Sequence, residues 1–304
     1  MRHFIEPGML TNEEYIELID KGLEIKKDPK KYSEVCKGML LGSLFFEPST
    51  RTKFSFDAAM LRLGGNILGF SDTNTTSSKK GESLADTIRI MSGYTDIIAM
   101  RHPNEGAALL ASQYSTVPVI NGGDGGHQHP TQTLTDLITI KYYKGTLEGH
   151  SIAFVGDLKY GRTVHSLIYT IARFNTKKIF LVSPEELSLP PTILEKLRET
   201  YPHLEIEEAA LLEDIIDKVD ILYMTRIQKE RFFNEADYIK LKNSFILTKE
   251  KMKFAKKDAI LLHPLPRVNE ISTDVDDDPR AVYFEQAVLG MYVRMALIMK
   301  LLEV

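Results

Sequence analysis

The chain has 304 residues, of which 43% are hydrophobic and 26% charged, values that are ordinary for a folded globular protein and exclude a disordered one. Its 38 Lys and Arg against 42 Asp and Glu give a net charge of -4, which offers no general electrostatic attraction for nucleic acid or for an anionic membrane surface. The apolar runs fall far short of the ~20 residues that span a bilayer, so we expect no membrane-spanning segment.

The single cysteine, Cys36, can form neither an intramolecular disulfide nor a cysteine-based zinc site. The first ten residues contain Glu6 and Pro7 and lack the apolar stretch of a signal peptide. We therefore expect a cytoplasmic protein, and we expect neither a metal ion nor an organic cofactor.

Apolar segments of strand length alternate with segments of helical period along almost the whole chain, a pattern typical of parallel sheets covered by helices. In the first half the pattern predicts one helix at residues 50–63, which ends at a Gly-Gly pair, and another at residues 130–144, which ends at Gly145. The strands expected there are residues 39–46, 66–70, 96–100 and 117–120.

The second half repeats this alternation. Its expected strands are 151–155, 178–182, 206–209, 220–224 and 260–263, and its expected helices are 163–174, 191–200, 212–219 and 284–302. A chain of this length exceeds the size of one hydrophobic core. We therefore predict two doubly wound α/β domains with parallel sheets, joined by helices: residues 1–133 and 134–285, with the C-terminal helix at 286–304 packing back on the first domain.

The most distinctive segment, EPSTRT at residues 47–52, stands where a predicted strand ends and a helix begins. Backbone N–H groups at a helix start, with the hydroxyls of Ser49, Thr50 and Thr52 and the guanidinium of Arg51, form a ready phosphate site. The alternative is that Ser49 only caps the helix. Capping does not require the Thr-Arg-Thr sequence, so anion binding is favoured.

A loop rich in hydroxyl groups follows at residues 71–81. Its default interpretation is a solvated surface loop with an exposed lysine pair. Beside a phosphate site, the same loop would act as a lid that brings Thr76 or Ser77 and Lys80 to the ligand.

Arg101 follows a predicted buried strand, and His129 and Gln132 open the long helix. Ligands of open α/β sheets lie beyond the carboxyl ends of the strands, so these side chains belong to the same rim as residues 49–52. A lone histidine at a helix start is more often a cap. The presence of Gln132 on the same edge favours a functional role.

Residues 156–163 of the second half nearly match a nucleotide P-loop, but the lysine position holds Arg162. The planar guanidinium suits a carboxylate, so we interpret Arg162 as a carboxylate clamp; a structural turn or a nucleotide-binding enzyme are the alternatives. Arg226 and Gln228 follow the end of another predicted strand and point to the same side, so they are a second candidate group for binding a carboxylate. An interdomain salt bridge of Arg226 is the alternative. Leu265, between two prolines, is placed to offer its carbonyl to a ligand amine, with a rigid turn as the alternative.

Taken in order, seven segments resemble the catalytic chains of the aspartate carbamoyltransferase family, from about residue 45 to the C-terminal helix. They are FFEPSTRTKFSF, KKGESLADT, MRHP, QHPTQTLTDL, VGDLKYGRTVHSL, DILYMTRIQKER and HPLPRV. Ornithine carbamoyltransferases usually carry an HCLP segment and an SMG loop instead. This chain has HPLP at residues 263–266, which favours aspartate; an ornithine or other amino-acid carbamoyltransferase is the alternative.

The resemblance implies transfer of the carbamoyl group of carbamoyl phosphate to the amino group of L-aspartate, an early step of pyrimidine biosynthesis. Thr52, Arg101 and His129 would be the catalytic residues. The residues implied to bind carbamoyl phosphate are Ser49, Thr50, Arg51, Thr52, Arg101, His129, Gln132, Leu265 and Pro266. Those implied to bind aspartate are Lys80, Arg162, Arg226 and Gln228.

The resemblance also implies a homotrimer with shared active sites, because in the family the loop with Thr76, Ser77 and Lys80 enters the site of the neighbouring chain. Glu47 and Arg231 would hold the domains closed. Regulatory subunits in a larger assembly are an option that the sequence leaves open. A non-enzymatic anion-binding subunit of the same fold is the remaining alternative.

Overall fold

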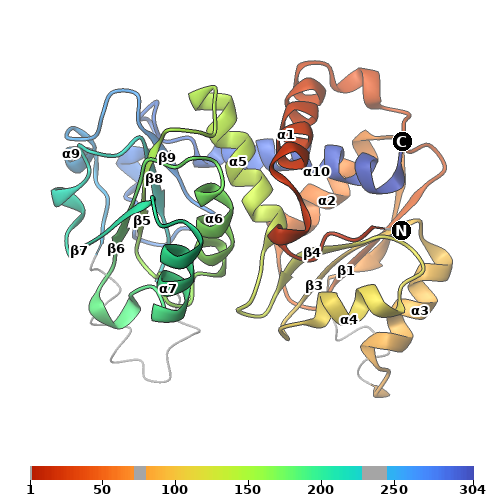
Figure 1. Ribbon diagram of the computed structural model, residues 1–304. Helices are drawn as coiled ribbons and strands as arrows, with labels where there is room; N and C mark the ends of the chain where they lie inside the picture. Colours follow the sequence, from red (N-terminus) through yellow and green to blue (C-terminus); the bar gives the residue numbers. More distant parts are fainter. Residues whose placement is uncertain (1, 72–79, 228–244) are drawn as a thin grey trace. The chain divides into compact units, whose positions relative to one another are not determined.

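The computed structural model describes residues 2–71, 80–227 and 245–304 (Figure 1). The chain divides into two compact units, one formed by Met1–Thr139 with Ala287–Val304 and the other by Ile140–Gln286. Each unit contains its own parallel sheet with helices on its faces, so the predicted α/β class with two parallel-sheet units is confirmed.

The first unit is built on a four-stranded sheet in the order β2-β1-β3-β4, in which all paired strands are parallel. Its strands are β1 (Leu40–Phe45), β2 (Asn66–Phe70), β3 (Ile97–His102) and β4 (Val119–Asp124). Its helices are α1 (Asn12–Lys27), α2 (Thr50–Arg62), α3 (Leu84–Tyr94) and α4 (Ala107–Tyr114), with most of α5 (Pro130–Lys144) and α10 (Tyr283–Leu302).

Buried side chains of β1 and β3 pack against α3 and α4 on one face of this sheet. Leu44 of β1, with Ile98 and Met100 of β3, contacts Ile88 of α3 and Ala111 of α4. Helices α1, α2 and α10 lie on the other side (Figure 1). Strand residues two apart point to the same face, which is why Ile98 and Met100 enter one core.

The second unit contains a five-stranded parallel sheet in the order β7-β6-β5-β8-β9. Its strands are β5 (Ser151–Val155), β6 (Lys178–Val182), β7 (Glu205–Ala209), β8 (Ile221–Met224) and β9 (Ile260–Leu262). Its α-helices within the described residues are α6 (Arg162–Ala172), α7 (Pro191–Thr200) and the short α9 (Lys249–Met252).

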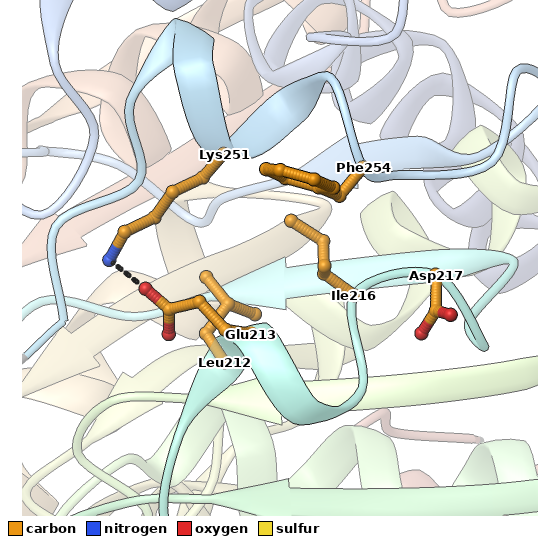
Figure 2. Close-up of a pocket in the computed structure, with 6 residues that line it drawn as sticks. All are labelled: Leu212, Glu213, Ile216, Asp217, Lys251 and Phe254. Carbon is orange, nitrogen blue, oxygen red and sulfur yellow. Dashed lines mark ion pairs between the residues drawn. The ribbon is translucent and has the colours of Figure 1, made fainter.

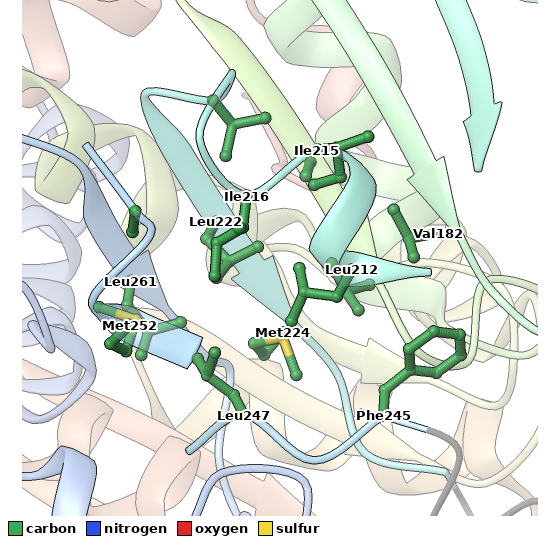
Figure 3. Packing of buried hydrophobic residues seen from close by; sticks show 14 of the residues in the cluster. Val182, Leu212, Ile215, Ile216, Leu222, Met224, Phe245, Leu247, Met252 and Leu261 are labelled. Carbon is green, nitrogen blue, oxygen red and sulfur yellow. The ribbon is translucent and has the colours of Figure 1, made fainter. Parts of the chain in front are cut away.

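Alternate residues of these strands form the core shown in Figure 3. Val155, Val182, Leu222, Met224 and Leu261 all point to this face, as the two-residue period of a strand requires. The segments that cover them supply Leu212, Ile215, Ile216, Phe245, Leu247 and Met252.

The expected bounds of several elements match the structure, including the strands at 66–70, 151–155 and 178–182 and the helices at 130–144 and 191–200. The α-helix expected at 212–219 is wrong. Only a 3-10 turn forms at Leu212–Asp214, and the backbone leaves the helical region at Ile215, whose φ is -130°. The apolar spacing that suggested a helix reflects burial of Leu212, Ile215, Ile216 and Val219 in the core; three of them are β-branched and have modest helix propensity.

Every helix within residues 2–71, 80–227 and 245–304 is too short or too polar to cross a membrane.

Candidate active site

Both sheets contain a point where the strand order reverses, and open α/β sheets bind ligands there, beyond the carboxyl ends of the strands. In the first unit β2 and β3 lie on opposite sides of β1, so this point falls between β1 and β3. In the second unit β6 and β8 lie on opposite sides of β5, so it falls between β5 and β8. The strands beside these points lead directly into the arginine-bearing segments singled out from the sequence.

Residues 49–52 connect β1 to α2. Ser49 occupies the N-cap position of α2, but its side chain makes no capping hydrogen bond, so the alternative in which Ser49 serves only as a cap does not describe this structure. Thr52 is only 9% exposed, whereas Thr50 and Arg51 are exposed. The first N–H groups of a helix point along its axis without intrahelical acceptors, so this helix start offers backbone donors, hydroxyls and a guanidinium to an anion.

Arg101 lies next to this helix start. It pairs with Phe45 in the register of β1 and β3, and its carbonyl accepts a hydrogen bond of 2.8 Å from the N–H of Phe46. Its Nε donates to Oε2 of Glu47 at 3.2 Å. Glu47 thus orients the guanidinium through Nε, while the terminal nitrogens of an arginine carry further N–H donors. The role of Glu47 with Arg231 in domain closure remains a prediction.

His129 and Gln132 enter the rim from the start of α5, after β4. The preceding loop is held by Asp124, which is 1% exposed. Its carboxylate accepts hydrogen bonds from the N–H of Gly106 at 2.9 Å and the N–H of Gln128 at 3.2 Å. His129 is buried, and its carbonyl accepts from the N–H of Gln132 at 3.0 Å. The strands β1, β3 and β4 are neighbours in the sheet order. Residues 49–52 follow β1, Arg101 lies at the end of β3, and His129 follows β4.

The second rim begins with Arg162, the first residue of α6. The loop after β5 is fastened to the end of β8: the N–H of Asp157 donates to Oγ1 of Thr225 at 3.0 Å, and that hydroxyl donates to the carbonyl of Val155 at 3.0 Å. A Cβ on Gly156 would lie 2.4 Å from the Thr225 carbonyl oxygen, and its φ is 115°, so only glycine fits. This attachment places the segments of Arg162 and Arg226 at one sheet edge.

Leu265 lies in a turn after β9 that is held by a buried pair, His263 and Glu270. The Leu265 N–H donates to Nδ1 of His263 at 2.8 Å. Because Nδ1 accepts, the ring proton of the neutral histidine is on Nε2, which donates to Oε1 of Glu270 at 2.7 Å. The other oxygen of Glu270 accepts from the N–H groups of Val268 and Asn269, both at 3.1 Å.

The backbone of Leu265 is in the left-handed region, with a φ of 50°, and the Leu265–Pro266 peptide bond is cis. A non-glycine residue keeps a positive φ only where its surroundings hold it there. The hydrogen bond from the Leu265 N–H to His263 provides that support. The rigid-turn interpretation and the ligand-carbonyl interpretation are therefore compatible.

Four predicted site residues, Thr76, Ser77, Gln228 and Arg231, lie outside the described residues. Lys80 is described and is exposed. Within the described ranges, no group of three or more His, Cys, Asp and Glu side chains is arranged to hold a metal ion.

Figure 2 shows a pocket of the second unit that contains none of the predicted site residues. Lys251 and Phe254 line one side of it, and Lys251 forms an ion pair of 2.8 Å with Glu213. Its residues precede β8 and β9 in the chain, whereas Arg226 and Leu265 follow them. This pocket is therefore separate from the rim of Arg162, Arg226 and Leu265.

Family models match both parts of the chain. Residues 2–142 match the carbamoyl-phosphate-binding domain of aspartate/ornithine carbamoyltransferases, and residues 148–301 match the domain of that family that binds aspartate or ornithine. The chain belongs to the aspartate/ornithine carbamoyltransferase family.

Members of this family that act on aspartate are similar over the whole length. The aspartate carbamoyltransferase catalytic subunit of Clostridium botulinum (strain Eklund 17B) is 60% identical over 303 residues, covering 100% of this chain and 98% of that protein. The corresponding subunit of Alkaliphilus metalliredigens is 58% identical, with 97% and 95% covered.

Two solved structures give the same result. The catalytic subunit of the M. jannaschii aspartate transcarbamoylase superposes with a TM-score of 0.92 at 49% identity, covering 100% of this chain and 98% of that one. The Trypanosoma cruzi aspartate transcarbamoylase in complex with carbamoyl phosphate gives a TM-score of 0.92 at 39% identity, covering 98% and 94%.

Sequence reasoning missed the carboxylates that hold these segments, Asp124 and Glu270. Asp124 ends β4 and Glu270 lies in the connection after β9, places where an acidic residue is usually a solvated turn former. For Glu270, the only sequence feature that could have suggested this role is its position seven residues after His263, beyond the two prolines. That position does not by itself indicate a buried pair.

We predict that the His263–Glu270 pair makes stability depend on pH. Burial lowers the pKa of His263. Burial is also the largest single effect on Glu270 and would raise its pKa, but the hydrogen bond and charge of His263 together with the backbone N–H donors outweigh it, so the pKa of Glu270 is lowered. Because the pKa values of His263 and Glu270 are both lowered by folding, the unfolded chain binds more protons than the folded one at acidic pH. Stability should therefore fall as the pH drops below 6.5, the ordinary value of histidine, and again below 4.5, that of glutamate.

Thermal unfolding between pH 7.5 and pH 5.5 (flanking the ~6.5 of free histidine) should give a shallower slope for His263→Asn than for the parent chain, because the buried ring no longer titrates. His203→Asn removes an exposed histidine and serves as the matched control. Identical slopes for the parent and His263→Asn would contradict this assignment.

Proposed function

We propose that this chain is the catalytic subunit of an aspartate carbamoyltransferase, which transfers the carbamoyl group of carbamoyl phosphate to L-aspartate and yields N-carbamoyl-L-aspartate and phosphate. The observation that carries the proposal is the arginine-bearing segment beside the switch point of each sheet, in a chain 60% identical to a catalytic subunit of that name. The family assignment removes the support for a nucleotide-binding enzyme, which depended on residues 156–163 alone.

In the first unit, residues 49–52 bind the phosphate of carbamoyl phosphate. Arg101 reaches both the phosphate and the carbonyl oxygen, and His129 donates to that oxygen. The amine of aspartate attacks the carbonyl carbon, so negative charge develops on this oxygen before the C–O bond to phosphate breaks and the amine loses its proton. Thr52, Arg101 and His129 are preorganised to stabilise that charge, and removing one such donor typically costs ~10²–10³ in rate.

In the second unit, Arg162 and Arg226 bind the carboxylates of aspartate, together with Gln228. A guanidinium forms paired hydrogen bonds with a carboxylate, which is the reason for arginine at both positions. Leu265, whose N–H is held by the His263–Glu270 pair, accepts a hydrogen bond from the carbamoyl amino group through its carbonyl, with Pro266 beside it. These cations supply locally the positive charge that the net charge of -4 lacks.

We assign residues 1–133, with the C-terminal helix, to carbamoyl phosphate binding and residues 134–285 to aspartate binding. The described units divide at residue 139 rather than at 133, within α5 in both cases. Glu47 and Arg231 are assigned to closure of the domains over the substrates.

A homotrimer with shared sites agrees with the exposed apolar side chains of the first unit. Phe54 and Leu61 of α2 are 62% and 57% exposed, and Ile90 of α3 is 56% exposed. Phe54 and Leu61 are seven residues apart, so they share one face of the helix. A surface of this kind is suited to burial against a second copy of the chain, from which Lys80 and Thr76 or Ser77 reach the neighbouring site.

The direct test is product formation from carbamoyl phosphate with aspartate and, in parallel, with ornithine. We expect carbamoyl aspartate with a preference of at least ~10²-fold in kcat/KM over citrulline, because ornithine lacks the second carboxylate. Arg162→Lys should raise the KM for aspartate, since lysine cannot form the paired contact. Arg198→Lys, on the exposed side of α7, is the matched control and should leave the KM unchanged.

Preferential formation of citrulline would establish the ornithine alternative instead. Binding of both substrates without any product would support the non-enzymatic alternative.

A mixing experiment tests the shared site. Arg51→Ala and Lys80→Ala chains should each be inactive, because each lacks one of the cations proposed to bind the substrates. After subunit exchange, about a quarter of the sites in a mixed cyclic trimer combine an intact Arg51 with an intact Lys80 from the next chain. The mixture should therefore regain about a quarter of the parent activity. Exchange demonstrated by mass, without recovery of activity, would show that the loop does not cross between chains.

A further inference from the structure

The first unit contains a buried cation, Arg294 of α10, which the proposed reaction does not use. It is 4% exposed, and arginine is seldom fully buried without partners. Its Nη1 donates to Oγ of Ser55 in α2 at 2.8 Å, and its guanidinium lies 5.1 Å from the ring centre of Phe56. Burial lowers the pKa of Arg294 to about 10, while the charge of Asp136 in α5 acts in the opposite direction. The residue is therefore a cation at neutral pH.

Gly290 makes room for this cation between α10 and α5. A Cβ at Gly290 would lie 2.8 Å from Nη1 of Arg294 and 2.7 Å from Oγ1 of Thr135. Only the missing side chain lets the guanidinium lie against the turn of α5 that carries Thr135 and Asp136. The arrangement therefore joins α10 to α2 and α5, the two helices whose first turns carry residues of the phosphate site.

Asp136 connects this cation to a ligand-binding residue. Its side chain is completely buried, and its Oδ1 accepts a hydrogen bond of 2.7 Å from Nε2 of Gln132, one turn earlier in α5. A buried carboxylate costs much less when a cation is nearby, so Arg294 favours the ionised form of Asp136. An ionised carboxylate only accepts hydrogen bonds, so it holds the NH₂ end of the Gln132 amide and not its oxygen.

The orientation of this amide has a chemical consequence. With Nε2 held by Asp136, the Gln132 side chain offers its carbonyl oxygen to a ligand, and that oxygen recognises an N–H donor. A carbamoyl group carries such a donor, whereas an acetyl group of the same shape carries a methyl group in its place.

We propose that Asp136 and Arg294 are positioning residues that fix the Gln132 amide with its oxygen toward the ligand, and that they thereby select a carbamoyl donor over an acyl donor. The inference rests on the proposed function and on the assignment of Gln132, with Leu265, to the carbamoyl phosphate site. A contact that only stabilises the fold would affect both donors equally, and this difference makes the inference testable.

The test uses Asp136→Asn, a substitution of nearly identical shape. The new amide can donate to the oxygen of Gln132, so the fixed orientation is lost. The KM for carbamoyl phosphate and the inhibition constant of acetyl phosphate against it are measured with the full chain. We expect the former to rise roughly tenfold, the effect of one lost hydrogen bond, and the latter to stay within about twofold. Arg294→Lys should shift the same ratio in the same direction.

Gln132→Met keeps the length of the side chain, removes the amide, and remains informative if Asp136→Asn does not fold. It should reduce the preference for carbamoyl phosphate over acetyl phosphate as much as Asp136→Asn does. In the Gln132→Met background, Asp136→Asn should have no further effect on the preference. An equal loss of affinity for both ligands in Asp136→Asn, or an unchanged preference in Gln132→Met, would overturn the inference.

The parent chain separates this result from failure of the proposed function. If the parent forms no carbamoyl aspartate, the proposed function fails. If the parent is active but the preference between the two ligands does not change in the variants, only the positioning role of Asp136 and Arg294 fails.

Discussion

Two small anions repel one another, and a reaction that joins them requires positive charge and N–H donors at fixed positions. A parallel sheet supplies such positions where its strand order reverses, because the segments leaving two neighbouring strands separate there and expose helix starts. This chain contains two such points, between β1 and β3 and between β5 and β8. The segments beside them carry Arg51 and Arg101 in one unit and Arg162 and Arg226 in the other.

A carboxylate lies behind several of the groups proposed to face ligands. Glu47 contacts Arg101, Asp136 holds the amide of Gln132, and Glu270 acts through His263 on the turn of Leu265. Asp124 holds the loop that leads to His129. Each carboxylate accepts hydrogen bonds and so leaves its partner with one orientation. Preorganisation of this kind matters more for catalysis than the number of contacts, because donors already in place need not rearrange as charge develops.

The sequence predicted the parallel-sheet class and the strand-end segments, because the alternation of apolar runs and the EPSTRT segment at residues 47–52 are local patterns. It failed at residues 212–219, where an apolar pattern that satisfies the core resembles a helix. It also did not reveal Arg294, whose contact with Ser55 joins residues 239 positions apart. Such distant partners are determined by helix packing, which a local sequence pattern does not reveal. Residue type alone also does not show whether an aspartate such as Asp136 is buried or exposed to solvent.

The central claim is that the four arginine-bearing segments bind one pair of anionic substrates. The most direct measurement is a crystal structure of this protein with N-(phosphonacetyl)-L-aspartate, the compound found in a Trypanosoma cruzi complex of the same fold. We expect the phosphonate within ~3 Å of the backbone N–H groups at the start of α2 and of Arg101, and the carboxylates at the same distance from Arg162 and Arg226. A phosphonate bound away from residues 49–52, or carboxylates contacted by neither arginine, would contradict the account.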